Sequence, residues 1–152
     1  MKTLWLTLIF FVLFSGCADK NAFEKFHMSE KEELGADAIL NSKVKNAQEV
    51  NGIVSVVYLN RVYPKNFPDN EVFYVNFYLK NKSKDFSFWL NGEKSIFTQE
   101  LQRDNFYAYL TPLKTKWSKY YLVKFKKQKD ILSFSLHNDS FSSNPLVFEK
   151  DE

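Results

Sequence analysis

The sequence predicts an all-β domain, an antiparallel sandwich of seven or eight strands. After about residue 46, apolar and polar residues alternate with the period of two that is typical of strands. Turn signals separate these runs at intervals of roughly eight to twelve residues, as in β-sandwiches. No helical pattern lies between the runs, so the crossover helices that parallel strands need are missing. A small closed barrel is the alternative arrangement.

The clearest alternation lies in two runs at residues 50–62 and 71–80. In the second run, Phe73, Val75 and Phe77 fall on one face, which we expect to be buried, and polar or tyrosine residues fall on the other. The joining segment, Y-P-K-N-F-P-D-N, contains two prolines and is predicted to be a loop.

The strongest turn signal in the chain is Asn91-Gly92. A two-residue type I′ turn needs positive φ at both positions, which asparagine and glycine tolerate best. The signal predicts a hairpin that pairs residues 85–90 with residues 93–101. Further strands are predicted at residues 105–110, 117–126, 131–137 and 144–150, with a hairpin through K-K-Q-K-D.

The first residues have the pattern of a secretory signal. Lys2 precedes an apolar stretch over residues 4–14, and the small residues Ser15 and Gly16 follow it. A helix of that length extends only about 16 Å, whereas the hydrocarbon core of a bilayer is about 30 Å thick. We therefore predict a cleaved signal peptide over residues 1–16.

The segment Phe14-Ser15-Gly16-Cys17 resembles the lipobox of bacterial lipoproteins, with Phe14 where leucine is commoner. The resemblance implies cleavage between Gly16 and Cys17, diacylation of the Cys17 thiol by fatty acids such as palmitate, and a stable membrane anchor. An ordinary secreted protein with an unmodified cysteine is the alternative. Because Cys17 is the only cysteine, no disulfide is expected, and stability must come from core packing.

The same resemblance bears on the location of the protein. In Gram-negative lipoproteins, aspartate after the lipidated cysteine tends to retain the protein in the inner membrane. Ala18 occupies that position here, which favours the outer membrane, facing the periplasm. The whole chain resembles small lipoproteins of Gram-negative bacteria.

Residues 17–46 are predicted to form the lipidated N-terminus and a tether. Ser29-Glu30-Lys31-Glu32 fits a capping box, which predicts a helix over residues 30–40, and a flexible tether is the alternative. Residues 47–152 form the predicted β domain. In strand number and in its Asn-Gly hairpin, it resembles the immunoglobulin-like (Ig-like) domains of bacterial envelope proteins, without their cysteine pair.

The sequence contains no catalytic motif, so we predict that the protein is not an enzyme. His27 and His137 lack partners at zinc-ligand spacing, and no cofactor is expected. With 21 basic and 18 acidic residues, the charge balance gives no support to nucleic-acid binding. A carboxylate site among Glu93, Glu100 and Asp104 is the least favoured alternative, and H-N-D-S is predicted to be a turn.

Two groups of residues are candidates for binding. Tyrosines on predicted outward or edge positions are suited to stacking on sugars or to protein contacts: Tyr74, Tyr78, Tyr107, Tyr109 and Tyr120. Lysines crowd the segment from residue 114 to residue 129, among them Lys124, Lys126 and Lys127. The sequence therefore predicts a membrane-anchored binding or structural module for an envelope protein, with glycan binding as the alternative. Ordinary cross-strand packing of the tyrosines and edge protection by the lysines are the structural alternatives.

Overall fold

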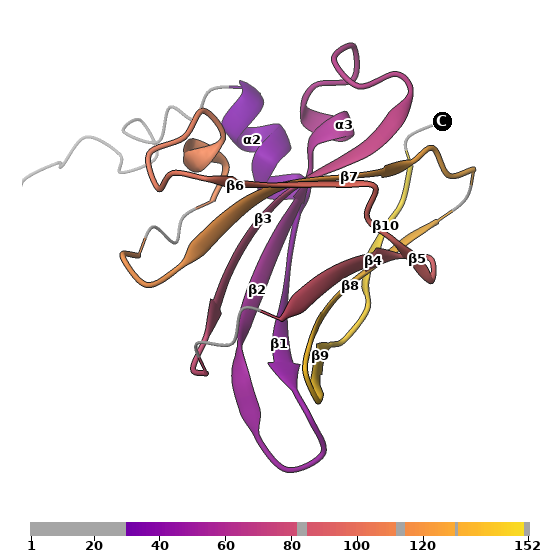
Figure 1. Ribbon diagram of the computed structural model, residues 1–152. Helices are drawn as coiled ribbons and strands as arrows, with labels where there is room; N and C mark the ends of the chain where they lie inside the picture. The colour runs from indigo at the N-terminus through magenta and orange to yellow at the C-terminus, as the bar shows by residue number, and fades with distance from the viewer. Residues whose placement is uncertain (1–29, 82–84, 112–114, 130, 151–152) are drawn as a thin grey trace, which may run out of the picture.

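The computed structural model describes residues 30–81, 85–111, 115–129 and 131–150 (Figure 1). Within them, every strand belongs to one antiparallel sheet. The strands are β1 Ile39–Lys45, β2 Val50–Tyr58, β3 Asn70–Leu79, β4 Phe86–Leu90, β5 Glu93–Lys94, β6 Phe97–Leu101, β7 Lys119–Lys126, β8 Leu132–Asn138, β9 Phe141–Ser143 and β10 Leu146–Phe148. Short helices are α2 Glu30–Asp37, α3 Leu59–Val62 and the 3-10 helix η2 Ala108–Leu110. The prediction of an all-β antiparallel domain is confirmed.

The sheet is curled, and the strands follow the order β5-β4-β8-β9-β1-β2-β3-β7-β6, with β10 paired to β8. Although β5 and β6 are consecutive in the chain, they lie at opposite ends of this order. The Ser95 amide donates to the Phe88 carbonyl of β4 at 3.0 Å, and the Ile96 amide donates to the Lys124 carbonyl of β7 at 2.9 Å. A two-residue step thus connects the two ends of the sheet.

Several predicted elements are confirmed. Asn91 and Gly92 adopt φ angles of 49° and 81°, so both central residues of the predicted turn have the positive φ of a type I′ turn. The predicted pairing of residues 93–101 with β4 is confirmed only for β5, because β6 pairs with β7 instead. Phe73, Val75 and Phe77 of β3 are buried. The H-N-D-S segment forms the turn between β8 and β9, where Asp139 has a φ of 50°.

The prediction for residues 39–45 differs from the structure. The sequence predicts that they belong to the tether, partly within its helix, whereas α2 ends at Asp37 and β1 begins at Ile39. β1 pairs with β2 along its whole length, and Val44 is fully buried. The segment I-L-N-S-K-V-K carries too few apolar residues to signal a strand by periodicity. Its strand conformation depends instead on hydrogen bonds to the neighbouring strand β2.

Two further predictions are wrong. Residues 105–110 form no strand, since the Asn105 side chain accepts a hydrogen bond from the Tyr107 amide at 2.9 Å and η2 follows. Asparagine side chains often organise such turns. The hairpin through K-K-Q-K-D is also absent, because β7 pairs with β3 and β6 whereas β8 pairs with β4, β9 and β10.

The two faces of the sheet bury separate cores. The inner core lies inside the curl and combines side chains from both halves of the sheet, including Phe73, Val75, Phe125, Phe134 and Leu136. The outer core lies on the opposite face, where residues such as Val57, Val72, Tyr74, Leu110 and Tyr120 pack together. Figure 1 shows α2, α3 and η2 gathered at one end of the sheet, with the β1–β2 hairpin at the other end. The helices and η2 therefore leave part of the outer face open.

Candidate functional site

The open part of the outer face carries the candidate binding site. Ile53 of β2 lies opposite Tyr78 of β3, and Ser55 lies opposite Asn76 in the same ladder. This register places the four side chains side by side, because directly paired residues share a face of the sheet. Ile53 and Tyr78 are each 41% exposed, an unusual position for apolar side chains of central strands.

Trp117 completes this surface from the turn that precedes β7. Its side chain is 68% exposed. The Thr115 hydroxyl oxygen accepts hydrogen bonds from the Trp117 amide at 3.3 Å and the Ser118 amide at 3.0 Å. The Tyr120 hydroxyl group donates to the Thr115 carbonyl at 3.1 Å. These contacts hold the turn, so the indole is presented from an ordered backbone. The prediction that Trp117 lies within the following strand is wrong, because β7 begins at Lys119.

These side chains surround a hollow of about 200 Å³, which we call the outer-face pocket. The Ser55 hydroxyl group donates to Asn41 Oδ1 at 2.5 Å and so presents a polar group beside the apolar surface. Pockets with mostly apolar walls and a few fixed polar groups are typical of ligand sites. The outer-face pocket is lined by Ile53, Ser55, Asn76, Phe77, Tyr78, Thr115, Trp117 and Ser118.

The predicted tyrosines do not form one row. Tyr78 lies in the outer-face pocket, but Tyr74 is fully buried in the outer core, where burial raises the pKa of its hydroxyl group. Tyr107 is half-buried, with its ring 5.8 Å from that of Tyr74. Tyr109 is 36% exposed, and its hydroxyl group is hydrogen bonded to that of Tyr63. The prediction of outward positions for Tyr74 and Tyr120 is wrong, because both side chains are buried in the outer core, where other elements cover that part of the face.

The lysines are likewise spread out. Lys119 and Lys126 lie at opposite ends of β7, and a rise of about 3.3 Å per residue separates them by roughly 23 Å. Lys124 lies over the Phe97 ring at 5.1 Å from its centroid. Lys127 Nζ lies 3.9 Å from a carboxylate oxygen of Glu71. The lysines of residues 116–129 are therefore distributed along the length of β7, whereas Lys124 and Lys126 share one face of the strand, two residues apart, and Lys127 follows directly.

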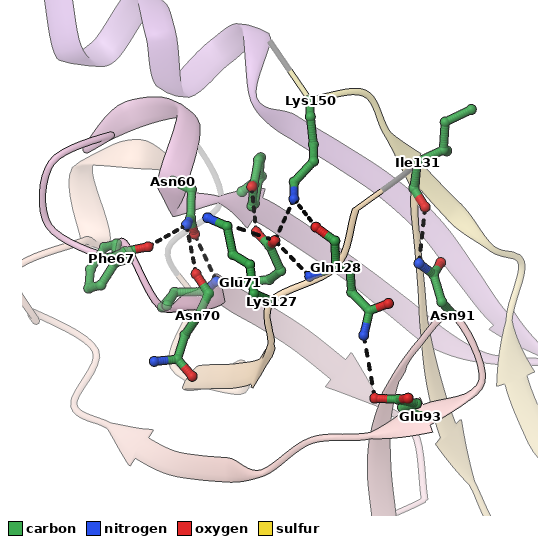
Figure 2. Close-up of polar contacts among 12 residues, drawn as sticks. Asn60, Phe67, Asn70, Glu71, Asn91, Glu93, Lys127, Gln128, Ile131 and Lys150 are labelled. Carbon is green, nitrogen blue, oxygen red and sulfur yellow. Dashed lines mark hydrogen bonds and ion pairs between the residues drawn. The ribbon is translucent and has the colours of Figure 1, made fainter. Parts of the chain in front are cut away.

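A buried carboxylate is the feature that sequence reasoning missed (Figure 2). Glu71 of β3 is fully buried, and its oxygens accept hydrogen bonds from Tyr58 Oη at 2.6 Å, Lys150 Nζ at 2.6 Å and the Gln128 amide at 3.1 Å. Lys150 also donates to the Gln128 carbonyl. An acidic residue at the start of the apolar run E-V-F-Y-V was the available signal.

The balance of these interactions sets the ionisation of Glu71. Burial by itself would raise the pKa of the carboxyl group, but the hydrogen bonds from Lys150, Tyr58 and Gln128 and the charge of Lys150 outweigh it and lower the pKa. Because Lys150 belongs to the C-terminal segment and Glu71 to β3, their ion pair at 2.6 Å links that segment to the sheet. The cluster around Glu71 is a structural site.

The three acids considered for catalysis are not brought together. Glu100 and Asp104 border one open hollow, and Asp104 pairs with Arg103 at 3.3 Å. Glu93 instead accepts a hydrogen bond from Gln128 Nε2 at 3.4 Å. His137 lies beside Trp89, with ring centroids 5.8 Å apart. Among the described residues, no three histidine, cysteine or acidic side chains are grouped as metal ligands.

Gly16, Cys17 and His27 lie outside the described residues. Within the described part of the chain, none of the helices has the length and apolar character needed to cross a membrane.

Comparison with known proteins finds no matching family model, no matching curated protein and no matching solved structure.

Proposed function

We propose that this chain is a lipid-anchored lipoprotein of the bacterial cell envelope whose β domain binds a protein partner without catalysis. The lipobox ending at Cys17 supports the anchor, on the outer membrane facing the periplasm. The antiparallel sheet and its type I′ hairpin support an Ig-like interaction domain. The outer-face pocket is the proposed binding site.

The clustering of Ile53, Tyr78 and Trp117 is the observation that carries this proposal. Together they bring an aliphatic and two aromatic side chains to the solvent-exposed wall of one hollow. Tryptophan and tyrosine are enriched among residues that dominate binding energy at protein interfaces. Burying them under a partner would remove apolar surface from water, which favours association.

The anchor is tested by replacing Cys17 with alanine. We expect the wild-type chain to fractionate with the outer membrane and its N-terminal peptide to carry fatty acids by mass spectrometry. The Cys17→Ala chain should remain uncleaved and carry none, because the thiol is the acceptor of the lipid. A wild-type N-terminal peptide without fatty acid would refute the anchor.

The binding site is tested with Trp117→Ser and Tyr78→Ser by crosslinking and co-purification from native envelopes. Each substitution is expected to weaken partner recovery by about 30-fold, the equivalent of a hot spot worth about 2 kcal/mol. Phe106→Ser is the matched control, because Phe106 is 71% exposed and outside the pocket. Equal recovery with all three variants, or recovery of no partner by the wild type, would contradict the proposal.

Glycan binding is the second candidate, and the polar lining of the same pocket favours it. The rings of Tyr78 and Trp117 lie beside the hydroxyl and amide groups of Ser55, Ser118 and Asn76. A sugar presents an apolar face that stacks on aromatic rings and hydroxyl groups that need such partners. Retention of the wild type on peptidoglycan or polysaccharide, lost in Trp117→Ser and kept in Phe106→Ser, would favour this candidate over a protein partner.

A further inference from the structure

The strand β6, Phe97–Leu101, forms an exposed edge of the sheet. It ends the strand order, and within the described residues it pairs only with β7. Its four residues from Phe97 to Glu100 are exposed. The pairing with β7 runs without a register shift from Phe97 opposite Lys124 to Leu101 opposite Tyr120. The free edge therefore presents a regular row of backbone groups.

This edge lacks three of the features by which proteins commonly prevent strand pairing. Exposed edge strands are commonly interrupted by proline, lysine or a bulge. The sequence F-T-Q-E-L of β6 contains no proline and no lysine, and its ladder contains no bulge. Ile96 and Phe97, at its beginning, are 54% and 43% exposed. The edge is thus open to a further strand.

The sequence of β6 is complementary to itself in one antiparallel register. When two copies pair about a two-fold axis at Gln99, Phe97 lies opposite Leu101, Thr98 lies opposite Glu100, and Gln99 lies opposite Gln99. Apolar side chains then meet apolar ones, the carboxylate meets a hydroxyl group, and two amides meet. All five residues of β6 take part.

Neighbouring registers are worse. An axis at Glu100 places two carboxylates directly opposite each other, which is destabilising. An axis at Thr98 requires Ser95 and Ile96 as partners and places Glu100 opposite Ile96. The Ser95 and Ile96 amides already donate to β4 and β7, respectively. Only the register centred on Gln99 uses the whole strand without such conflicts.

We propose that β6 is a self-association edge at which two copies of this chain pair antiparallel about Gln99 and join their sheets. An isologous two-fold contact of this kind closes on itself and leaves no free edge at β6 for further addition. A five-residue edge buries little surface, so the contact is weak in solution. This step rests on the proposed lipid anchor: attachment to one membrane would raise the effective concentration of the two copies and favour pairing there. The inference is independent of the outer-face pocket.

Disulfide trapping in native membranes tests the register. In the full chain, Gln99→Cys is expected to form a crosslinked dimer under mild oxidation. Paired Cα atoms of antiparallel strands lie about 4.5–5.5 Å apart, within the range that a disulfide spans. Thr98→Cys is the matched control, because residue 98 then lies diagonal to its copy at about 7–8 Å, beyond that range. The unsubstituted chain reports any background from Cys17.

A second pair of variants tests the same register through charge. Gln99→Lys places two ammonium groups opposite each other and should lower the recovery of the dimer. The dimer is captured with a photocrosslinker that does not react with amines, so the new lysines do not themselves change the yield. Thr98→Lys places each new ammonium group opposite the Glu100 carboxylate of the other copy and should raise the recovery of the dimer. Circular dichroism establishes that both variants fold.

Three outcomes would overturn the proposal. They are equal disulfide trapping of Thr98→Cys and Gln99→Cys, no disulfide trapping of Gln99→Cys, and the same change in dimer recovery from Thr98→Lys and Gln99→Lys.

Discussion

Phe73→Ala is expected to destabilise the domain by about 3–5 kcal/mol, the range for truncating a buried phenylalanine. The Phe73 side chain is fully buried at the centre of the inner core. Its ring centroid lies 5.1 to 5.8 Å from those of four other rings, Tyr58, Phe125, Phe134 and Phe148. These residues come from four different strands of the curled sheet. The substitution therefore leaves a cavity where the two halves of the sheet meet.

Chemical denaturation followed by circular dichroism measures this effect. Phe106→Ala is the control with the same chemical change, because Phe106 is 71% exposed and its loss should cost less than about 1 kcal/mol. A midpoint for Phe73→Ala close to that of Phe106→Ala would mean that the two halves of the sheet do not pack together as described.

Lys150→Met is expected to lower stability at neutral pH by about 2–3 kcal/mol, because hydrogen bonds to charged groups contribute about 1.5–3 kcal/mol each and the Glu71 carboxylate stays buried. Tyr58 Oη and the Gln128 amide still donate to that carboxylate, and Lys127 Nζ remains 3.9 Å away. Because these contacts remain, the expected loss of stability is smaller than for a buried carboxylate with no partner at all. Denaturation at several pH values gives the measurement.

The pH dependence of this loss has a definite sign. In the wild type the pKa of Glu71 is lowered, so its contribution to stability is present above the ordinary carboxyl pKa and is lost as the pH falls. Removing the Lys150 ammonium group removes the largest contribution that lowers the pKa of Glu71, so the variant carboxylate takes up a proton at a higher pH than the wild type does, and protonation relieves the buried charge. The difference between variant and wild type should therefore shrink below about pH 4.

Lys129→Met is the control for this experiment, since Lys129 is an exposed lysine on the same connecting segment as Gln128. It should change stability by less than about 0.5 kcal/mol at any pH. A loss for Lys150→Met that is the same at pH 7 and well below pH 4 would show that the ion pair with Glu71 is not its cause.

Sequence patterns correctly predict the elements whose conformation depends on residues adjacent in the chain. Asn91-Gly92 specified its own turn, because positive φ is a property of those two residues. The alternation in β3 correctly placed Phe73, Val75 and Phe77 in the core. In contrast, β1 follows α2 directly and was not recognised, since its stability comes from pairing with β2.

The candidate site was only partly predictable. Tyr78 was recognised as an outward tyrosine, and Tyr74, on the same face, was wrongly assigned the same role. Alternation tells which face a side chain occupies, but it does not tell what covers that face. Trp117 was missed because the Thr115 hydroxyl group, and not a strand ladder, fixes its backbone.

Periodicity and backbone preference, which act between neighbours in the chain, suffice to predict the all-β class, the turn at Asn91-Gly92 and the inner face of β3. Tertiary contacts alone set the strand order, the crossing from β5 to β6, the burial of Tyr74 and the ion pair between Glu71 and Lys150. These depend on contacts between residues far apart in sequence, and many strand orders satisfy the same alternation. The outer-face pocket belongs to this second group, since β2, β3 and the turn before β7 each supply part of it.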